Sequence, residues 1–377
     1  MQLTVTRRTA VAVALSAVSA LALQGLALPS AHASTPAASS APSDSATVGG
    51  IEAATARAVA RSLGNADWRA QIRTAALGSR QVDLATLTAR ASAPTALNSA
   101  VSTADGRIAT AKGLPATTGS LLRLRLGADS MRGALTTKVK PLVAVAANDD
   151  SATAVTAYDS AGRAHTLSAG QTPKQPVYVI DIDVSKAVSL GLAQVNKAFE
   201  KAGLRAPMKA AAGNAGYWTT KVDSVYLNDD EEPWVLGDAE IYSIVSGFGL
   251  DGNVRVDTVT MPYLDDDHTT YYPNQILVNW SNYKYNEADV VMMEDDGDTN
   301  YATLAKALAD ALLTITDQGT YIPLVDAILA ALPTSWYTND ADYVDSWYTL
   351  AQSSSGRVNG ARGNGWMTVS PYFVQQF

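Results

Sequence analysis

The chain has 377 residues, no cysteine, three histidines and a formal net charge of −8 at pH 7. The absence of cysteine excludes thiol nucleophiles, thiolate zinc sites and iron–sulfur clusters, so stability has to come from buried apolar surface or bound metal. Residues 1–220 carry 22 Lys and Arg against 12 Asp and Glu, whereas residues 221–300 carry 3 against 18. Because the basic residues are dispersed among alanines, we expect no nucleic-acid binding.

The N-terminus has the three parts of an export signal. Arg7 and Arg8 precede an uncharged run rich in Ala, Leu and Val, and residues 31–33 (AHA) offer small residues at the cleavage positions. The arginine pair is compatible with either the general or the twin-arginine export route. We expect residues 1–33 to be a signal peptide and the mature chain to be secreted and extracellular. No later apolar run approaches membrane length, so the mature protein is not expected to be an integral membrane protein.

The N-terminal half predicts a linker, then helices, then a small α/β segment. Residues 34–50, rich in Ser, Ala and Pro, predict a disordered linker. Helical spacing of apolar residues then predicts a small helical bundle, with helices at 51–63, 67–77, 82–91 and 95–111. Short apolar runs predict strands at 141–146, 154–158 and 176–183, followed by a helix at 184–204. We expect one Ala-rich helical and then small α/β domain over residues 51–205.

The C-terminal half predicts a β domain. Residues 206–217 form a second expected linker, after which alanine falls and aromatic and β-branched residues rise. Short strands bounded by Asp, Asn and Gly predict an antiparallel β-sandwich over 218–377. The expected strands cover 221–227, 239–248, 254–264, 275–280, 288–293, 347–352 and 366–374. Leucines at helical spacing and Pro323 predict a helical insertion at 303–332. The fold class is therefore expected to be α+β.

Acidic residues gather in four short segments at the ends of these strands. Loops of Asp, Asn and Gly supply the carboxylate and carbonyl oxygens that Ca²⁺ prefers, and a bound ion relieves the repulsion between the acids. The alternative for each segment is that Asp and Asn form the turn through hydrogen bonds to the backbone. We hypothesise a calcium site. The candidate ligands are Asp229, Asp230, Asp238, Glu294, Asp295, Asp296, Asp298, Asp340 and Asp345.

Enzyme signatures are weak. No G-x-S-x-G elbow, P-loop or dinucleotide fingerprint is present. Paired carboxylates permit glycoside hydrolysis, but acid pairs are too frequent here to be specific. Asp266 and Asp267 beside His268 could orient that imidazole as a base, although a lone histidine in an acidic loop is usually just exposed. Aromatic residues that either stack on sugars or fill the core are Trp234, Trp280, Tyr283, Tyr285, Trp336 and Tyr337.

Three segments resemble a family of secreted bacterial proteins of unassigned function. They are Pro141–Asp183 (PLVAVAANDD to PVYVIDID), Leu227–Tyr242 (LNDDEEPWVLGDAEIY) and Asn339–Tyr372 (NDADYVDSWYTL to GARGNGWMTVSPY). The resemblance implies a shared two-part architecture and brings no reaction or catalytic residue. The acidic loops also resemble those of calcium-dependent C2-type sandwiches by analogy of loop chemistry, although the helical insertion departs from that pattern.

The sequence therefore predicts a non-enzymatic, calcium-stabilised secreted protein whose β domain binds a cell-envelope or extracellular polymer. The alternative is a secreted hydrolase, acting on glycans or peptides through the carboxylates of its acidic loops. A third hypothesis makes the basic N-terminal half a pro-region that docks on the acidic domain through opposite charge, an attraction that salt weakens.

Overall fold

The computed structural model describes seven stretches of the chain. They are residues 47–90, 93–146, 152–205, 216–229, 240–295, 297–332 and 343–375. The chain divides into two units, Met1–Ala41 and Pro42–Phe377, and every described residue belongs to the second. The expected signal peptide, residues 1–33, and most of the expected linker at 206–217 lie outside the described residues. Among the described helices, none is long and apolar enough to cross a membrane.

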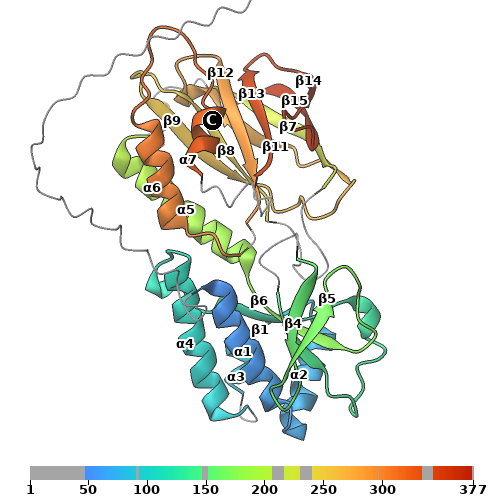
Figure 1. Ribbon diagram of the computed structural model, residues 1–377. Helices are drawn as coiled ribbons and strands as arrows, with labels where there is room; N and C mark the ends of the chain where they lie inside the picture. Colours follow the sequence, from blue (N-terminus) through green and yellow to red (C-terminus); the bar gives the residue numbers. More distant parts are fainter. Residues whose placement is uncertain are drawn as a thin grey trace, which may run out of the picture. The chain divides into compact units, whose positions relative to one another are not determined.

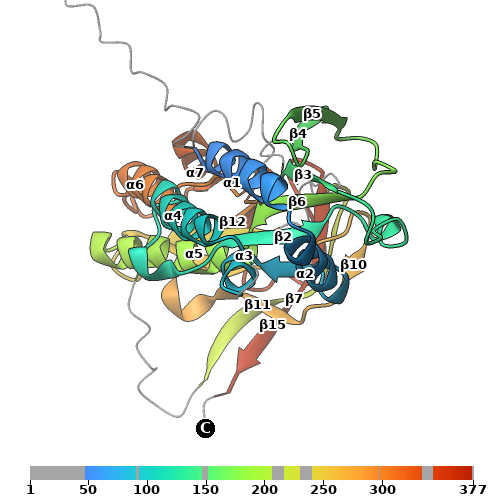
Figure 2. The ribbon, with the colours of Figure 1, turned by 90° about the horizontal axis from the view of Figure 1, so that it is seen from below.

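The N-terminal part consists of a six-stranded sheet with helices packed against it. Its elements are α1 (Val48–Ser62), α2 (Ala66–Gly78), β1 (Gln81–Asp83), α3 (Leu84–Thr88), α4 (Thr95–Ala111), η2 (Ala116–Thr118), β2 (Leu122–Leu126), η3 (Asp129–Met131), β3 (Leu142–Val145), β4 (Ala154–Tyr158), β5 (Ala164–Ser168), β6 (Val177–Ile182) and α5 (Val184–Ala202). The strands form sheet A in the order β1-β2-β6-β3-β4-β5, antiparallel except for the parallel pair β3–β6. Helices α1 and α4 pack against each other and against its strands (Figure 2).

The described residues of the C-terminal part form two antiparallel sheets, two α-helices and a short 3-10 helix. Its elements are β7 (Tyr217–Leu227), β8 (Tyr242–Phe248), β9 (Val254–Thr260), β10 (Thr270–Tyr271), β11 (Gln275–Asn279), η4 (Trp280–Asn282), β12 (Glu287–Met293), α6 (Tyr301–Leu312), α7 (Val325–Ala331), β13 (Tyr343–Ala351), β14 (Gly356–Asn359) and β15 (Gly365–Val374). Sheet B has the order β10-β7-β15-β14, with β11 also paired to β7, and sheet C has the order β13-β12-β8-β9. Side chains of both sheets share one hydrophobic cluster, with Val225 and Met367 from sheet B and Val245 and Val290 from sheet C. The chain is therefore a mixed α+β protein.

Capping side chains set where α1, α2, α5 and α6 begin. Thr47 Oγ1 accepts a hydrogen bond from the Gly50 amide at the start of α1. Asn65, Asp183 and Asn300 accept hydrogen bonds from backbone amides in the same way at the starts of α2, α5 and α6. Each cap satisfies an amide that has no partner inside the helix, so these short polar residues fix the boundaries that the apolar spacing alone leaves open.

Most expected elements are confirmed, with ends that differ by a few residues. The expected helix at 82–91 is wrong at its start, because residues 81–83 form β1 and pair with β2 before Asp83 caps α3. The expected helical bundle is also wrong, because its helices pack against sheet A. Helix α1 begins at Val48, so the last three residues of the expected disordered linker are helical. Strands β2, β5, β10 and β14 were not expected.

Strand β2 was missed because arginines alternate with its leucines. Arg123 and Arg125 pair with Asp183 and Asp181, at the end of the neighbouring strand β6. Both members of the Arg125–Asp181 pair are more than nine-tenths buried. The charge on β2 is tolerated because strand pairing brings carboxylates to both guanidinium groups: Asp181 and Asp183 from the end of β6, and Asp83 of β1, which also pairs with Arg123.

One fully buried ion pair connects the end of α4 with the segment after β12. Lys112 Nζ lies 3.3 Å from Asp295 Oδ1, and both side chains are inaccessible to solvent. The ammonium also donates to the Gly297 carbonyl at 2.7 Å. Asp295 accepts hydrogen bonds from the Gly297 amide at 2.8 Å and from the Tyr301 hydroxyl. Since each charge has an opposite charge and further hydrogen bonds, the cost of removing both from water is offset.

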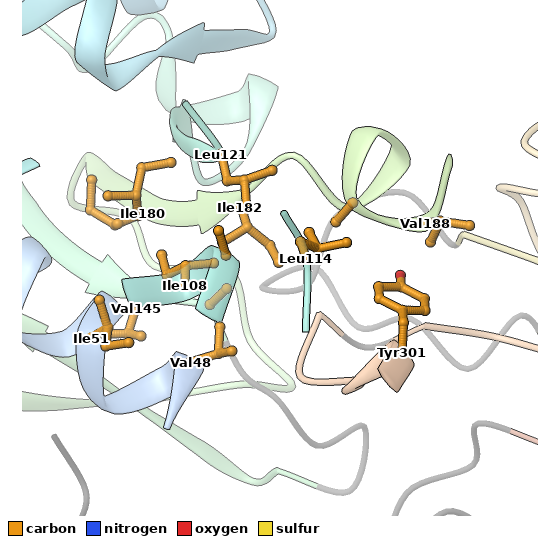
Figure 3. Close-up of a cluster of buried hydrophobic side chains, with 14 of the residues drawn as sticks. Val48, Ile51, Ile108, Leu114, Leu121, Val145, Ile180, Ile182, Val188 and Tyr301 are labelled. Atoms are coloured by element: carbon orange, nitrogen blue, oxygen red, sulfur yellow. The ribbon is translucent and has the colours of Figure 1, made fainter. Parts of the chain in front are cut away.

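Apolar packing surrounds this ion pair. Figure 3 shows Tyr301, at the start of α6, pointing toward Val188 of α5 and lying beside Leu114. The ring lies so close to Gly191 of α5 that any larger residue there would overlap it. The close approach of α5 and α6, visible in Figure 1, therefore depends on this glycine. The same hydrophobic cluster holds residues from α1, sheet A, α5, sheet C and α6.

We predict that Lys112→Met lowers the free energy of unfolding by about 3–5 kcal/mol, because it leaves the Asp295 carboxylate buried without its cation. Adding Asp295→Asn should recover most of the loss, since no uncompensated charge then remains. Urea unfolding followed by tryptophan fluorescence measures both variants.

Lys306→Met is the matched control, because it removes the exposed partner of Asp310 on α6, and little change is expected. If Lys112→Met were as mild as this control, the buried pair would not be the constraint described above.

Candidate functional site

The first of two adjoining concavities is a cavity of about 660 Å³ that we call the polar cleft. It lies where strands β2 and β6 end and α5 begins, and residues from the segment 240–265 complete its wall. Its lining residues are Ser79, Arg80, Gln81, Arg125, Leu126, Gly127, Ala128, Asp129, Arg132, Asp181, Ile182, Asp183, Val184, Ser185, Glu240, Pro262 and Asp265. This volume is typical of ligand sites, which measure about 300–1,000 Å³.

The second concavity, of about 610 Å³, is the aromatic groove. It is lined by Thr260, Pro262, Tyr263, Tyr271, Tyr272, Pro273 and Gln275. The chain forms it by leaving β9, pairing briefly with β7 as β10, and returning as β11. Tyr272 is 73% exposed, so its ring is offered to solvent. Pro262 lines both concavities, so the aromatic groove and the polar cleft adjoin at this residue.

Hydrogen bonds hold two of the groove tyrosines in place. The Tyr263 hydroxyl donates to Gln275 Oε1 at 2.6 Å, and the amide of the same glutamine donates to the Thr260 carbonyl at 2.8 Å. The Tyr271 hydroxyl donates a shared hydrogen bond to Asp265 at 3.0 Å and Asp266 at 3.2 Å. Burial and the hydrogen bond to Asp265 raise the pKa of Tyr271, so this hydroxyl keeps its proton. Rings held in this way need little ordering when a ligand binds.

The charges of the polar cleft are extensively paired with one another. Arg125 lies 3.3 Å from Asp181, and Arg132 lies 2.8 Å from Asp129. Asp183 caps α5 and pairs with Arg123 at 2.5 Å. Burial raises the pKa of Asp181, while the nearby Arg125 charge opposes that rise. The cleft thus offers a polar, mixed-charge surface to a ligand.

A buried glutamate interacts electrostatically with the cleft residue Asp181. Glu52 of α1 is 1% exposed, and its Oε2 atom has no hydrogen-bond partner among the described residues. Burial raises the pKa of Glu52 well above its ordinary value of 4.5; repulsion from Asp181 adds to the rise, the Lys112 charge opposes it, and Asp298 adds to it. The neutral acid is therefore the favoured form of this side chain in the folded protein.

The candidate metal ligands at the end of β12 are Glu294, Asp295 and Asp298. Glu294 and Asp295 are buried, whereas Asp298 is exposed just before α6. The Asp295 carboxylate is bound by Lys112 and by two hydrogen-bond donors. Asp230, Asp238, Asp296 and Asp340 lie outside the described residues.

The remaining candidate ligands, Asp229 and Asp345, both lie against the loop that precedes β15. Asp345 is fully buried and accepts hydrogen bonds from the amides of Arg362 and Gly365, both at 2.8 Å. Asp229 is exposed and its amide donates to Asn364 Oδ1. Asp345 organises this loop in the manner of a turn-forming aspartate. In the parts of the chain that the structure describes, no group of three or more His, Asp or Glu side chains is placed to hold a metal ion.

The aromatic residues and the histidine that the sequence offered as site candidates are also not gathered in one place among the described residues. Trp280 and Tyr283 are buried in the cluster shared by sheets B and C, and Tyr285 is half-buried. Trp234, Trp336 and Tyr337 lie outside the described residues. His268 is exposed, and its Nδ1 atom lies 3.2 Å from the Tyr226 hydroxyl.

The groove residues were not predicted as a site. Tyr263 fell inside the strand expected at 254–264, and Tyr271 and Tyr272 fell between it and the next expected strand. The two-residue strand β10 is too short to produce a pattern. The available signal was the density of three tyrosines and two prolines on either side of residues 265–267. Only the pairing of β10 and β11 with β7 brings them to one concavity.

The fold and the site define a mixed α+β protein with a polar cleft that adjoins an aromatic groove. Residues 54–377 match the family model described as "Protein of unknown function (DUF3103)", and the chain belongs to that family. Neither a curated protein nor a solved structure matches the chain. The resemblance to a family of unassigned function is thereby confirmed.

We predict that Glu52→Gln changes how stability depends on pH. Since the pKa of Glu52 is raised in the folded state, the folded protein keeps a proton that the unfolded chain loses above pH 4.5. The stability that the protonated Glu52 side chain contributes is fully present below pH 4.5. It is lost as the pH rises through the folded-state pKa. Glutamine binds no proton, so the melting temperature of the variant relative to wild type should rise from pH 5 to pH 8.

Glu200→Gln, on the solvent side of α5, is the matched control and should show a flat difference. A flat difference for Glu52→Gln as well would mean that the buried carboxyl titrates normally.

Proposed function

We propose that this chain is a glycan-binding protein whose ligand is an extended polysaccharide. The supporting observation is that the aromatic groove and the polar cleft adjoin at Pro262, which would let a ligand of several units contact both. Tyrosine rings offer flat apolar faces for sugar rings, and the side chains of Gln275 and the cleft offer hydrogen bonds to hydroxyl groups.

We also propose that the chain is exported, with residues 1–33 removed, and that the polysaccharide belongs to the cell envelope or the extracellular medium. The charged start, apolar run and small cleavage residues of the N-terminus support this setting. The expected two-domain division at 206–217, with an antiparallel β-sandwich that is C2-like by analogy, is proposed as well. The hydrophobic cluster that sheets B and C share supports the sandwich.

Calcium binding is a separate proposal that rests on the sequence. Its candidate ligands are the nine acidic residues named above, of which Asp229 and Asp298 are exposed in the described part of the chain. The oxygen-rich composition of the acidic segments supports it.

A hydrolase is the second candidate function, and one observation favours it. Asp181 lines the polar cleft, and burial raises its pKa, as in a carboxyl that donates a proton to a leaving group. Release of new reducing ends from a bound polysaccharide is the result that would assign the chain to this class.

We predict that Tyr272→Ala weakens polysaccharide binding by about fivefold, corresponding to the roughly 1 kcal/mol of one aromatic contact. Affinity electrophoresis of the chain through gels containing different polysaccharides measures the change. Tyr372→Ala, which removes a 47% exposed tyrosine of β15 outside the groove, is the control and should bind as wild type does. Unchanged binding of Tyr272→Ala, or no retardation by any polysaccharide, would refute the proposed function.

We predict that calcium raises the melting temperature of residues 34–377 after treatment with EDTA, and that magnesium does not. At one hundred times the dissociation constant, one site adds about 2.7 kcal/mol to the free energy of unfolding. Asp298→Asn should reduce the shift, whereas Asp310→Asn, an exposed acid of α6 outside the candidate set, should leave it unchanged. An identical melting curve with and without calcium would refute the proposed calcium site.

A further inference from the structure

We infer that the aromatic groove selects a cationic sugar unit, so that the polysaccharide of this protein carries protonated amines. This inference rests on the proposed function and names the class of its ligand. It follows from the electrostatics of Tyr271, from the negative charges around the groove and from the absence of basic side chains among the described residues that line it.

Tyr271 is the central feature of the groove. Its hydroxyl donates to both Asp265 and Asp266, at 3.0 and 3.2 Å. A phenol that donates to two carboxylates has more negative charge in its ring than a phenol in water, and a cation is attracted to the face of such a ring. The Tyr263 ring lies 6.1 Å away and is tilted by 49°, so the two rings form adjacent walls around one position.

The charges at this end of the site are negative. Asp266 and Asp267 are exposed and Asp265 is half-buried. The groove lies within the segment 221–300, whose 18 acids outnumber its 3 bases. None of the described side chains that line the groove is basic.

Three described basic groups close to the groove, Lys221, Arg125 and Arg132, are already paired with acids. Lys221, whose Nζ lies 3.4 Å from Asn274 Oδ1 beside the groove, forms an ion pair with Asp223 at 2.9 Å. In the adjoining cleft, Arg125 and Arg132 are paired with carboxylates, as described above. A protonated amine in the groove would therefore meet electron-rich rings, with the Asp265 and Asp266 carboxylates at the Tyr271 hydroxyl, and no basic side chain among the described residues of the groove wall.

Chitosan and chitin oligomers of equal length provide a matched pair of probes. Both have the same sugar backbone, and N-acetylation removes the positive charge from chitin. At mildly acidic pH and low ionic strength, isothermal titration calorimetry should show that chitosan binds at least about fivefold more tightly than chitin. Added salt should reduce this difference, because salt screens the attraction between exposed charges.

Three variants separate charge from stacking. Asp266→Asn should weaken chitosan binding and leave chitin unchanged, because it removes one carboxylate charge and keeps an acceptor for Tyr271. Tyr272→Ala should weaken binding of both oligomers. Asp310→Asn, which makes the same charge change on α6, should alter neither.

Equal affinity for the two oligomers, or no binding of chitosan, would overturn the inference that the groove selects a cationic sugar. In that event, Tyr272-dependent binding of another polysaccharide would still support the proposed function, so the two failures are distinguishable. Tyr272-dependent binding of polylysine with no binding of chitosan would assign the groove to basic peptides and overturn the glycan.

Discussion

The buried ion pair between Lys112 and Asp295 is the constraint on which the rest of the described structure depends. Removing an ammonium and a carboxylate from water costs several kcal/mol each, and close contact with further hydrogen bonds is what offsets that cost. Here the contact forces the end of α4 against the segment that follows β12, and the Tyr301 hydroxyl completes the arrangement. The helical layer of sheet A and the strands of sheet C are thereby held in one arrangement, around a hydrophobic cluster that both supply.

This arrangement also positions the candidate site. The polar cleft needs the ends of β2 and β6 on one side and residues 240–265 on the other. The ion pair between Arg125 and Asp181 stiffens its wall, and hydrogen bonds from Tyr263 and Tyr271 hold the adjoining aromatic groove. A binding surface that is already ordered loses less entropy on association, which suits a protein that recognises a flexible polymer.

The acidic residues show that composition alone does not predict the role of a single carboxylate. As a group they predict a metal, because oxygen-rich turns suit calcium. In the structure, Asp295 neutralises a buried lysine, Asp345 organises a loop, and Asp265 and Asp266 bind a tyrosine hydroxyl. These roles differ because burial and the nearest donor decide what a carboxylate does, and neither quantity is visible in a list of neighbours along the chain.

Local sequence was sufficient for most helices and strands, since apolar spacing and polar caps act within a few residues. It also indicated the α+β class and the change in amino-acid composition near residue 206. The tertiary structure alone decided that β2 is a strand despite its arginines, that β1 interrupts an expected helix, and that three tyrosines meet in a groove. Each of these depends on partners far away in the chain: carboxylates at the end of β6, an edge of β2, and pairing with β7. Register between distant strands is set by the packing of the whole core, and for that reason it cannot be derived from any single segment.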